Sequence, residues 1–166
     1  GKKGYPSLPV FGLAFELPEQ ISRFSWYGRG PWENYPDRRA GAGLGIYEST
    51  KKEQLARYLK PQECGMHMDT RRLVLETKDG EKLLFEAEKK PFHFSLLPYS
   101  PIELETALHR EELPAQSHTW AVIAGAIRGV GGNDSGGAPV YPEYEIPGDR
   151  DIIFEFSMGF ISHHED

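Results

Sequence analysis

Residues 24–39 read FSWYGRGPWENYPDRR, and this stretch joins a strand pattern to a crowded polar loop. Residues 21–27 alternate with a period of two and carry aromatic and β-branched members, which predicts a strand leading into the loop. The alternation stops at Gly28. Gly30-Pro31 is a loop signal, and Pro36 favours an extended backbone just before it. We therefore expect a strand followed by an irregular loop, the kind of segment that carries binding sites on a rigid scaffold.

The composition limits the class of protein. A chain of 166 residues has the length of one domain. The net charge of -6 argues against nucleic acid or an anionic membrane as a partner, since either would need a clustered basic face. No apolar run reaches the roughly 18 residues of a membrane span. Cys64 is the only cysteine, so an internal disulfide is excluded, and both cytoplasm and periplasm stay open.

The rest of the chain is rich in short strand patterns separated by glycine and proline. They cover residues 8–17, 56–59, 71–76, 82–86, 92–97, 120–124 and 151–160. Asp79-Gly80 is a hairpin turn signal, while residues 40–45 and 129–137 are expected to form glycine-rich turns or loops. This pattern predicts an all-β fold, a large two-sheet antiparallel β-sandwich with one short helix.

The one substantial helix is expected to begin at Ser100, with Pro101 in the first helical position and Glu103 closing a capping box. Its inward stripe would consist of Leu104, Ala107 and Leu108, and Pro114 would end it. Residues 48–57 are only weakly helical by propensity. Along the chain, residues 1–7 are interpreted as a linker or leftover segment, 8–160 as the sandwich domain and 161–166 as a flexible tail. The initial Gly in place of Met suggests a piece of a longer polypeptide.

Glu33 and Asp37 are the residue types that glycosidases use as acid and nucleophile. Catalysis needs one raised pKa, whereas the neighbouring Arg38 and Arg39 would favour the ionised carboxylates. Three roles are therefore weighed for this pair: catalysis, contact with a sugar or a neighbouring domain, and bracing of the loop.

Two other groups of side chains are candidates for binding. Cys64, His67 and Asp69 can be drawn as half of a metal site, but a closed tetrahedral site needs four ligands, so we predict no metal and no cofactor in this chain. Among the aromatics, Trp26 lies on a strand and is expected in the core. Trp32 lies between Pro31 and Glu33 and is the better candidate for an exposed ring that stacks on a sugar.

Three motifs in order carry a family resemblance. They are the stretch at 24–39, RYLKPQECG at 57–65 with DTR at 69–71, and GVGGNDS at 129–135. Together they resemble the C-terminal β-sandwich domain, or small-chain-like domain, of the lactose-type β-galactosidases of glycoside hydrolase family 2. The resemblance extends over residues 8–157.

This resemblance implies a supersandwich of the galactose-mutarotase type and a bacterial source. It also implies that the two catalytic glutamates, together with the Mg and Na that parent enzymes often use, lie in a separate barrel domain. The implied partners are that catalytic barrel, a galactoside substrate and, in the full enzyme, further copies of the same chain. In related enzymes a Trp commonly follows the Asp-Ser pair of the third motif, whereas this chain has Gly136.

The candidate carbohydrate-binding or domain-interface residues lie in two loops. They are Trp32, Glu33, Asn34, Tyr35, Asp37, Arg38, Asn133, Asp134 and Ser135. The first hypothesis is an accessory domain of a β-galactosidase that hydrolyses terminal β-D-galactosides such as lactose, bordering the active site and supporting assembly without catalytic residues of its own. The alternative is an autonomous carbohydrate-binding module. A third hypothesis, a small enzyme that uses Glu33 and Asp37, is also kept.

Overall fold

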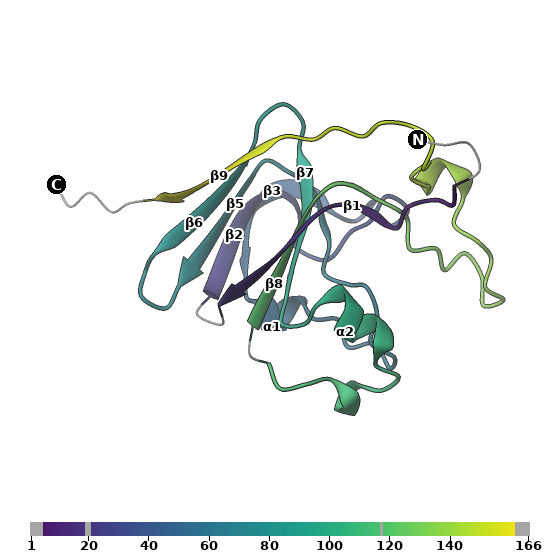
Figure 1. Cartoon of the computed structure of the whole chain (residues 1–166), viewed down its shortest axis with the longest axis horizontal. Coiled ribbons are helices and arrows are strands. Elements are labelled where there is room, and N and C mark those ends of the chain that lie inside the picture. Colours follow the sequence, from purple (N-terminus) through teal and green to yellow (C-terminus); the bar gives the residue numbers. More distant parts are fainter. Residues whose placement is uncertain (1–4, 19–20, 117, 162–166) are drawn as a thin grey trace.

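The computed structural model describes residues 5–18, 21–116 and 118–161. In these residues two antiparallel sheets pack face to face, which confirms the predicted all-β sandwich (Figure 1). The first sheet has the order β1 (Val10–Pro18), β8 (His118–Ile127), β7 (Phe92–Leu97), β4 (His67–Thr70). The second has the order β3 (Gly43–Ser49), β2 (Ile21–Gly30), β5 (Arg72–Thr77), β6 (Lys82–Ala87), β9 (Phe156–Ile161).

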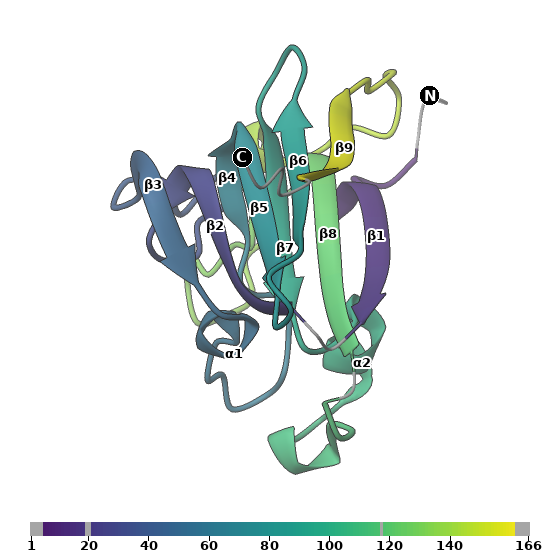
Figure 2. The same ribbon diagram turned by 90° about the vertical axis from the view of Figure 1, so that its left-hand side faces the viewer.

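The core lies between the two sheets and is unusually aromatic. Strand alternation places one face of each strand inward, so that the central strands β2, β5 and β6 face β7 and β8. The buried residues of this core are Ile21, Phe24, Trp26, Leu73, Leu75, Phe85, Phe92, Phe94, Leu96, Ala121 and Ile123. Figure 2 shows β3 as an edge strand of the second sheet, in agreement with the strand order.

Several expected elements are confirmed. The hairpin of β5 and β6 forms around Asp79-Gly80, where Gly80 has the positive φ of 85° that the turn requires. Strand β7 buries Phe92, Phe94 and Leu96 on one face. Strand β2 forms as expected but continues two residues beyond Gly28, because its end pairs with the glycine-rich start of β3.

The glycine-rich segment 40–45 is therefore not only a turn, since β3 begins at Gly43. The side chain of Tyr47 lies over Gly45, where an added β-carbon would lie 3.0 Å from its hydroxyl oxygen and 3.1 Å from the nearest ring carbon. The Tyr47 hydroxyl donates to the Gly43 carbonyl. The edge strand β3 can form here because Gly45, which has no side chain, leaves space for the Tyr47 ring.

The prediction of a strand at 56–59 is wrong. This segment is irregular, and Leu59 is 95% exposed. Leu55, Ala56 and Tyr58 instead pack with their side chains against a second small core that includes Cys64 and Leu97. The segment is thus held by side-chain packing and by the loop at 31–38, without a backbone ladder.

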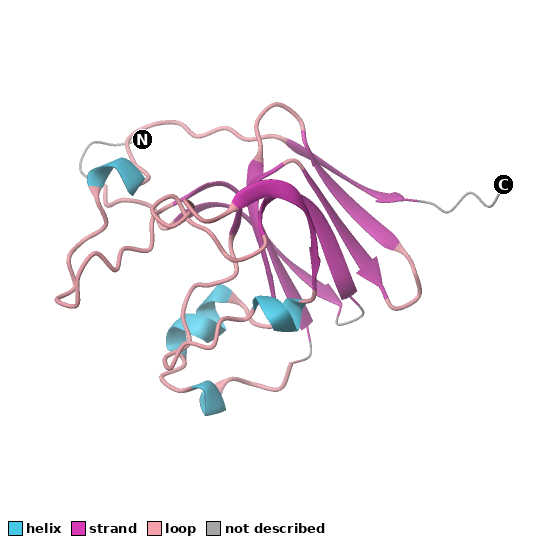
Figure 3. Cartoon of the chain, turned by 180° about the vertical axis from the view of Figure 1, so that it is seen from behind, coloured by secondary structure: helices cyan, strands magenta, loops and turns pink. Residues whose placement is uncertain are grey.

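The helical content also differs in part from the expectation. Helix α2 (Pro101–Thr106) has the predicted capping box between Ser100 and Glu103, but it ends at Thr106, well before Pro114. Leu104 and Ala107 are buried as expected, whereas Leu108 is exposed because the chain leaves the helix before it. A second short helix, α1 (Lys51–Gln54), and two 3-10 turns, η1 (Arg110–Glu112) and η2 (Pro142–Tyr144), accompany it. Figure 3 shows these helical turns outside the two sheets.

The last strand is shorter than predicted. It begins at Phe156 and not at Asp151, and Ile153 is exposed in the segment that precedes it. Phe154 still packs against the core, with its ring 5.9 Å from that of Phe11. Most of the expected tail at 161–166 and the first part of 1–7 lie outside the described residues. Within the described residues, none of the helices is long and apolar enough to cross a membrane.

Candidate functional site

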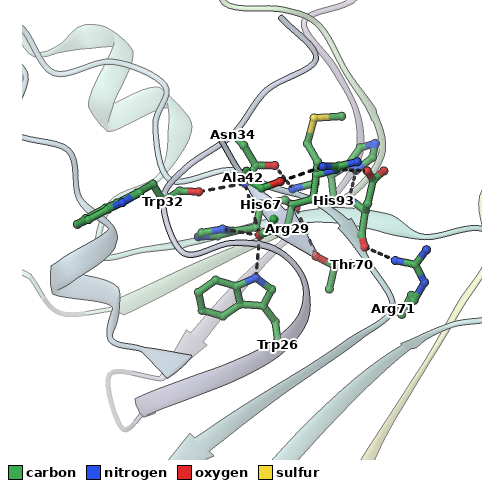
Figure 4. Close-up of polar contacts among 12 residues, drawn as sticks. Trp26, Arg29, Trp32, Asn34, Ala42, His67, Thr70, Arg71 and His93 are labelled. Carbon is green, nitrogen blue, oxygen red and sulfur yellow. Dashed lines mark hydrogen bonds and ion pairs between the residues drawn. The ribbon is translucent and has the colours of Figure 1, made fainter. Parts of the chain in front are cut away.

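The loop at 31–38 leaves the end of β2 and is fixed from inside by Asn34. The Asn34 backbone N–H donates to the Met66 carbonyl at 2.7 Å, and its side-chain oxygen accepts from the Met68 N–H at 3.0 Å. Its amide nitrogen donates to the Trp32 carbonyl at 3.0 Å (Figure 4). Asn34 is fully buried. Its side chain is therefore unavailable to a sugar, and its role in this chain is to hold the loop against β4.

Tyr35 is likewise buried, and its hydroxyl donates to the Glu63 carboxylate at 3.3 Å. Burial is the main cause that raises the pKa of Tyr35 well above its usual value, so the phenol stays protonated. The candidate role of Tyr35 in binding a carbohydrate is corrected by this burial, because neither face of the ring is open to solvent.

Glu33 braces the loop against the irregular segment that follows α1. One of its carboxylate oxygens accepts from the Tyr58 hydroxyl at 2.5 Å, and the other accepts from the Gly65 N–H at 2.8 Å. Arg38 reaches the same tyrosine, and this hydrogen bond to Tyr58 is the first cause that raises the Arg38 pKa. The motif residues Glu33, Arg38, Tyr58 and Gly65 thus form one structural unit, although they come from two separate motifs of the sequence.

Asp37 joins the first loop to the second. Its two carboxylate oxygens accept from the N–H groups of Val130 at 3.1 Å and Gly131 at 2.8 Å. The contact demands glycine at 129, since a β-carbon there would lie 2.5 Å from the Asp37 carboxylate. All four carboxylate oxygens of Glu33 and Asp37 are therefore engaged within the chain, in different directions. Glu33 lines a groove that Asp37 does not line, so the two carboxylates are not opposed across that groove as a glycosidase pair would be.

The second loop, around 133–135, is held mainly by its own hydrogen bonds. Asn133 donates to the Pro139 carbonyl, and the Asp134 carboxylate accepts from the N–H groups of Gly136 and Ala138. These backbone hydrogen bonds lower the pKa of Asp134. Ser135 is exposed. At Gly136 an added β-carbon would meet only the Asp134 carboxylate, at 3.6 Å or more, so a larger side chain would fit there.

A polar cluster that the sequence did not single out as a site lies at the centre of these loops. Arg29 donates to the Asp69 carboxylate at 2.6 Å and to the Ala42 carbonyl at 2.9 Å. Its own carbonyl accepts from the Trp26 indole at 3.0 Å and lies 3.2 Å from a ring nitrogen of His67. Figure 4 shows these groups converging on Arg29. In the sequence, the position of Arg29 between two glycines is the feature that could have indicated this cluster.

His67 and Asp69, considered above as half of a metal site with Cys64, have separate structural roles. His67 lies between the rings of Trp26 and Phe94, and burial lowers its pKa to about 4. Burial raises the pKa of the Cys64 thiol to about 12, which keeps the thiol protonated. In the part of the chain that the structure describes, no group of three or more His, Cys, Asp or Glu side chains is arranged to hold a metal ion.

Trp32 is the one aromatic of the first loop that remains at the surface, with 78% of its area exposed. It borders a groove of about 750 Å³ between the loop, the end of β3 and α1. The groove is lined by Pro31, Trp32, Glu33, Glu48, Ser49, Lys52, Glu53, Gln54, Leu55, Ala56 and Arg57.

Replacing Glu33 by glutamine should lower the free energy of unfolding by about 1–3 kcal/mol, because the amide keeps a single acceptor oxygen and can accept from only one of the Tyr58 hydroxyl and the Gly65 N–H, which leaves the other donor unpaired. Urea denaturation would measure the change. Glu48→Gln is the matched control, since Glu48 is exposed, and it should stay within about 0.5 kcal/mol of the parent. Equal stability of both variants would show that Glu33 is not a brace.

The fold and the loops together define a class of protein: a β-sandwich whose motif residues are used mainly to hold its loops in place. The family model described as "Beta galactosidase small chain" matches residues 2–158, and the chain belongs to this family.

Curated relatives agree with this assignment. The chain is 45% identical to a β-galactosidase small subunit of Latilactobacillus sakei, over 96% of this chain and 53% of the relative. It is 37% identical to a β-galactosidase of Halalkalibacterium halodurans, over 95% of this chain and 16% of the relative. For a β-galactosidase of Streptococcus thermophilus the identity is 42%, over 87% of this chain and 14% of the relative. The chain thus spans about half, or much less, of the length of these relatives.

Proposed function

We propose that this chain acts as an accessory part of a β-galactosidase. It would dock on the separate catalytic barrel, border the pocket for terminal β-D-galactosides such as lactose and support assembly, without supplying the catalytic carboxylates. The match to the small-chain family over residues 2–158 is the observation that carries this proposal. The engagement of all four oxygens of Glu33 and Asp37 supports it further, since neither carboxylate is left to act on a substrate.

The hydrogen bonds between Asp37 and the backbone at 130–131 support the two loops as the part of the chain that faces the catalytic barrel. Asp37 holds the backbone at 130–131, and the polar loop at 133–135 follows directly. Loops fixed in this way present a preformed surface, which lowers the entropic cost of docking. We expect any Mg or Na of the assembled enzyme to be held by the catalytic part, and further copies of the assembled enzyme to associate.

The test uses a relative that carries the matching segment within its own chain. The Streptococcus thermophilus β-galactosidase would be shortened by the segment that matches this chain, and this chain would be added in trans. We expect the shortened enzyme and this chain to be inactive separately, and the mixture to hydrolyse o-nitrophenyl β-D-galactoside and to co-elute in size-exclusion chromatography.

Two variants sharpen the experiment. Asp37→Ala releases the loop at 130–131 and should reduce the restored activity at least tenfold, whereas Lys78→Ala, in the turn between β5 and β6, should restore activity like the parent chain. Failure to restore hydrolysis together with failure to co-elute would contradict the proposal. Hydrolysis by this chain alone would favour the small-enzyme hypothesis.

A further inference from the structure

The backbone around Trp32 is rigidly held although the indole itself is exposed. On one side, the Trp32 carbonyl accepts from the Asn34 amide, and on the other the loop begins at the end of β2. The next residue, Glu33, is fixed by two hydrogen bonds. In Figure 4 the indole points away from the polar cluster around Arg29 and His93. The buried framework holds this large aromatic side chain in an exposed position. Exposure of the apolar indole surface to water is unfavourable, so such an arrangement indicates a binding surface.

The groove beside this indole offers hydrogen-bonding groups that the chain leaves free. Lys52 and Arg57 are exposed and make no hydrogen bond among the described residues. Glu48 is exposed on β3 and adds an acceptor. Leu55 and Ala56 are half-buried and give the groove an apolar part. An aromatic platform with a few donors and acceptors around it is the usual composition of a small-molecule site.

The charges of the groove narrow the class of ligand. Its lining holds three carboxylates, from Glu33, Glu48 and Glu53, against two cations, from Lys52 and Arg57. Glu33 is engaged by Tyr58 and Gly65, and Glu53 is engaged in the capping box of α1. The groove therefore carries no strong excess of either sign toward a ligand, which disfavours an anion such as phosphate and equally a cation.

We propose that the groove beside Trp32 binds a neutral saccharide, with one apolar face of a pyranose ring stacked on the indole and its hydroxyls bonded to Lys52, Arg57 and Glu48. This site differs from the loop at 133–135, because none of that loop's residues lines the groove. Of the candidate set derived from the sequence, only Trp32 and Glu33 line this groove, whereas Asn34 and Tyr35 are buried and Asp37 is engaged elsewhere. The inference does not depend on the accessory role proposed above.

Titration of the isolated chain with lactose, followed by amide NMR, tests this directly. The chain has three tryptophans, so three indole N–H signals serve as internal probes, and the buried Trp26 acts as a reference. We expect saturable shifts of the Trp32 indole and of backbone amides at 52–57, with no shift at 133–135. Sucrose, offered at the same concentrations, measures the selectivity for galactosides.

Variants decide whether the indole carries the binding. Trp32→Ala should weaken lactose binding about tenfold, which corresponds to the loss of a stacking contact of about 1.4 kcal/mol. Tyr141→Ala removes another exposed aromatic ring outside the groove and should leave binding unchanged. Because Trp32 is exposed, its removal should keep the dispersed spectrum of the folded chain.

Three results would overturn the saccharide site. They are the absence of saturable shifts up to the solubility of lactose, unchanged affinity in Trp32→Ala, and shifts confined to the loop at 133–135. If Trp32→Ala impairs only co-elution with the shortened β-galactosidase and lactose causes no shift, the groove is a protein interface and the saccharide site is rejected. Restoration of activity in trans by Trp32→Ala would leave the accessory role intact, so the two proposals fail separately.

Discussion

Replacing Trp26 by alanine should lower the free energy of unfolding by about 3–5 kcal/mol, the range for removal of a large aromatic side chain from a core. Trp26 is only 2% exposed, and its ring contacts those of Phe24, Tyr47, His67 and Phe94. Its indole N–H also donates to the Arg29 carbonyl, the acceptor on which the loop cluster converges. The alanine variant therefore loses both the sheet-to-sheet contact and the support of the loops.

The matched control is the same substitution at Trp32. Because the Trp32 indole is exposed, Trp32→Ala should change the free energy of unfolding by less than about 0.5 kcal/mol. Urea denaturation followed by far-ultraviolet circular dichroism would measure both variants. Similar losses in the two variants would contradict the arrangement in which Trp26 belongs to the core and Trp32 to the surface.

The second large effect is a loss of stability at acid pH that depends on His67. Burial lowers the pKa of His67 to about 4 from its usual 6.5, and the hydrogen bond to the Arg29 carbonyl opposes this only in part. Between these two values the unfolded chain binds a proton that the folded chain excludes, so stability is complete above pH 6.5 and falls as the pH drops toward 4. We expect the titration of His67 to lower the free energy of unfolding by about 2 kcal/mol between pH 7 and pH 5.

Other groups titrate in the same range, so the comparison must be made between variants. The pKa of His93, which faces Asp69 and Arg39, is also lowered by burial, whereas the pKa of Glu63 is raised to about 7 and acts in the opposite direction. Glu63 retains exposed surface, and solvent screens its contribution. The difference in slope between the parent and a His67 variant cancels these contributions.

His67→Gln is the test variant, because glutamine keeps a donor and an acceptor near the Arg29 carbonyl and Gln54 but carries no titrating group. We expect it to be less stable at pH 7 and to lose about 2 kcal/mol less than the parent on going to pH 5. His109→Gln removes an exposed histidine whose pKa is raised by its hydrogen bond to Glu112. Solvent screens that interaction, so this control should change the acid slope only slightly, and in the direction opposite to His67→Gln. A parent-like slope in His67→Gln would disprove the assignment.

Local patterns predicted much of the fold. Alternation located β2 and β7, Asp79-Gly80 located the hairpin of β5 and β6, and the capping box located the start of α2. Each of these signals is contained within a few neighbouring residues. The errors arose where a segment is held by distant partners, as at 56–59, or where backbone pairing extends a strand through glycines, as at Gly43.

The sequence by itself determined the class of the protein, since a two-period pattern, a single helix signal and three ordered motifs sufficed for the β-sandwich and its family. Only the tertiary structure decided what the motif residues do. Glu33 meets Gly65 across 32 positions and Asp37 meets Gly131 across 94, so no local pattern could reveal these partners. Burial likewise separated Asn34 and Tyr35, which hold the loop, from Trp32, which remains at the surface, because burial depends on which strands and loops pack over a residue.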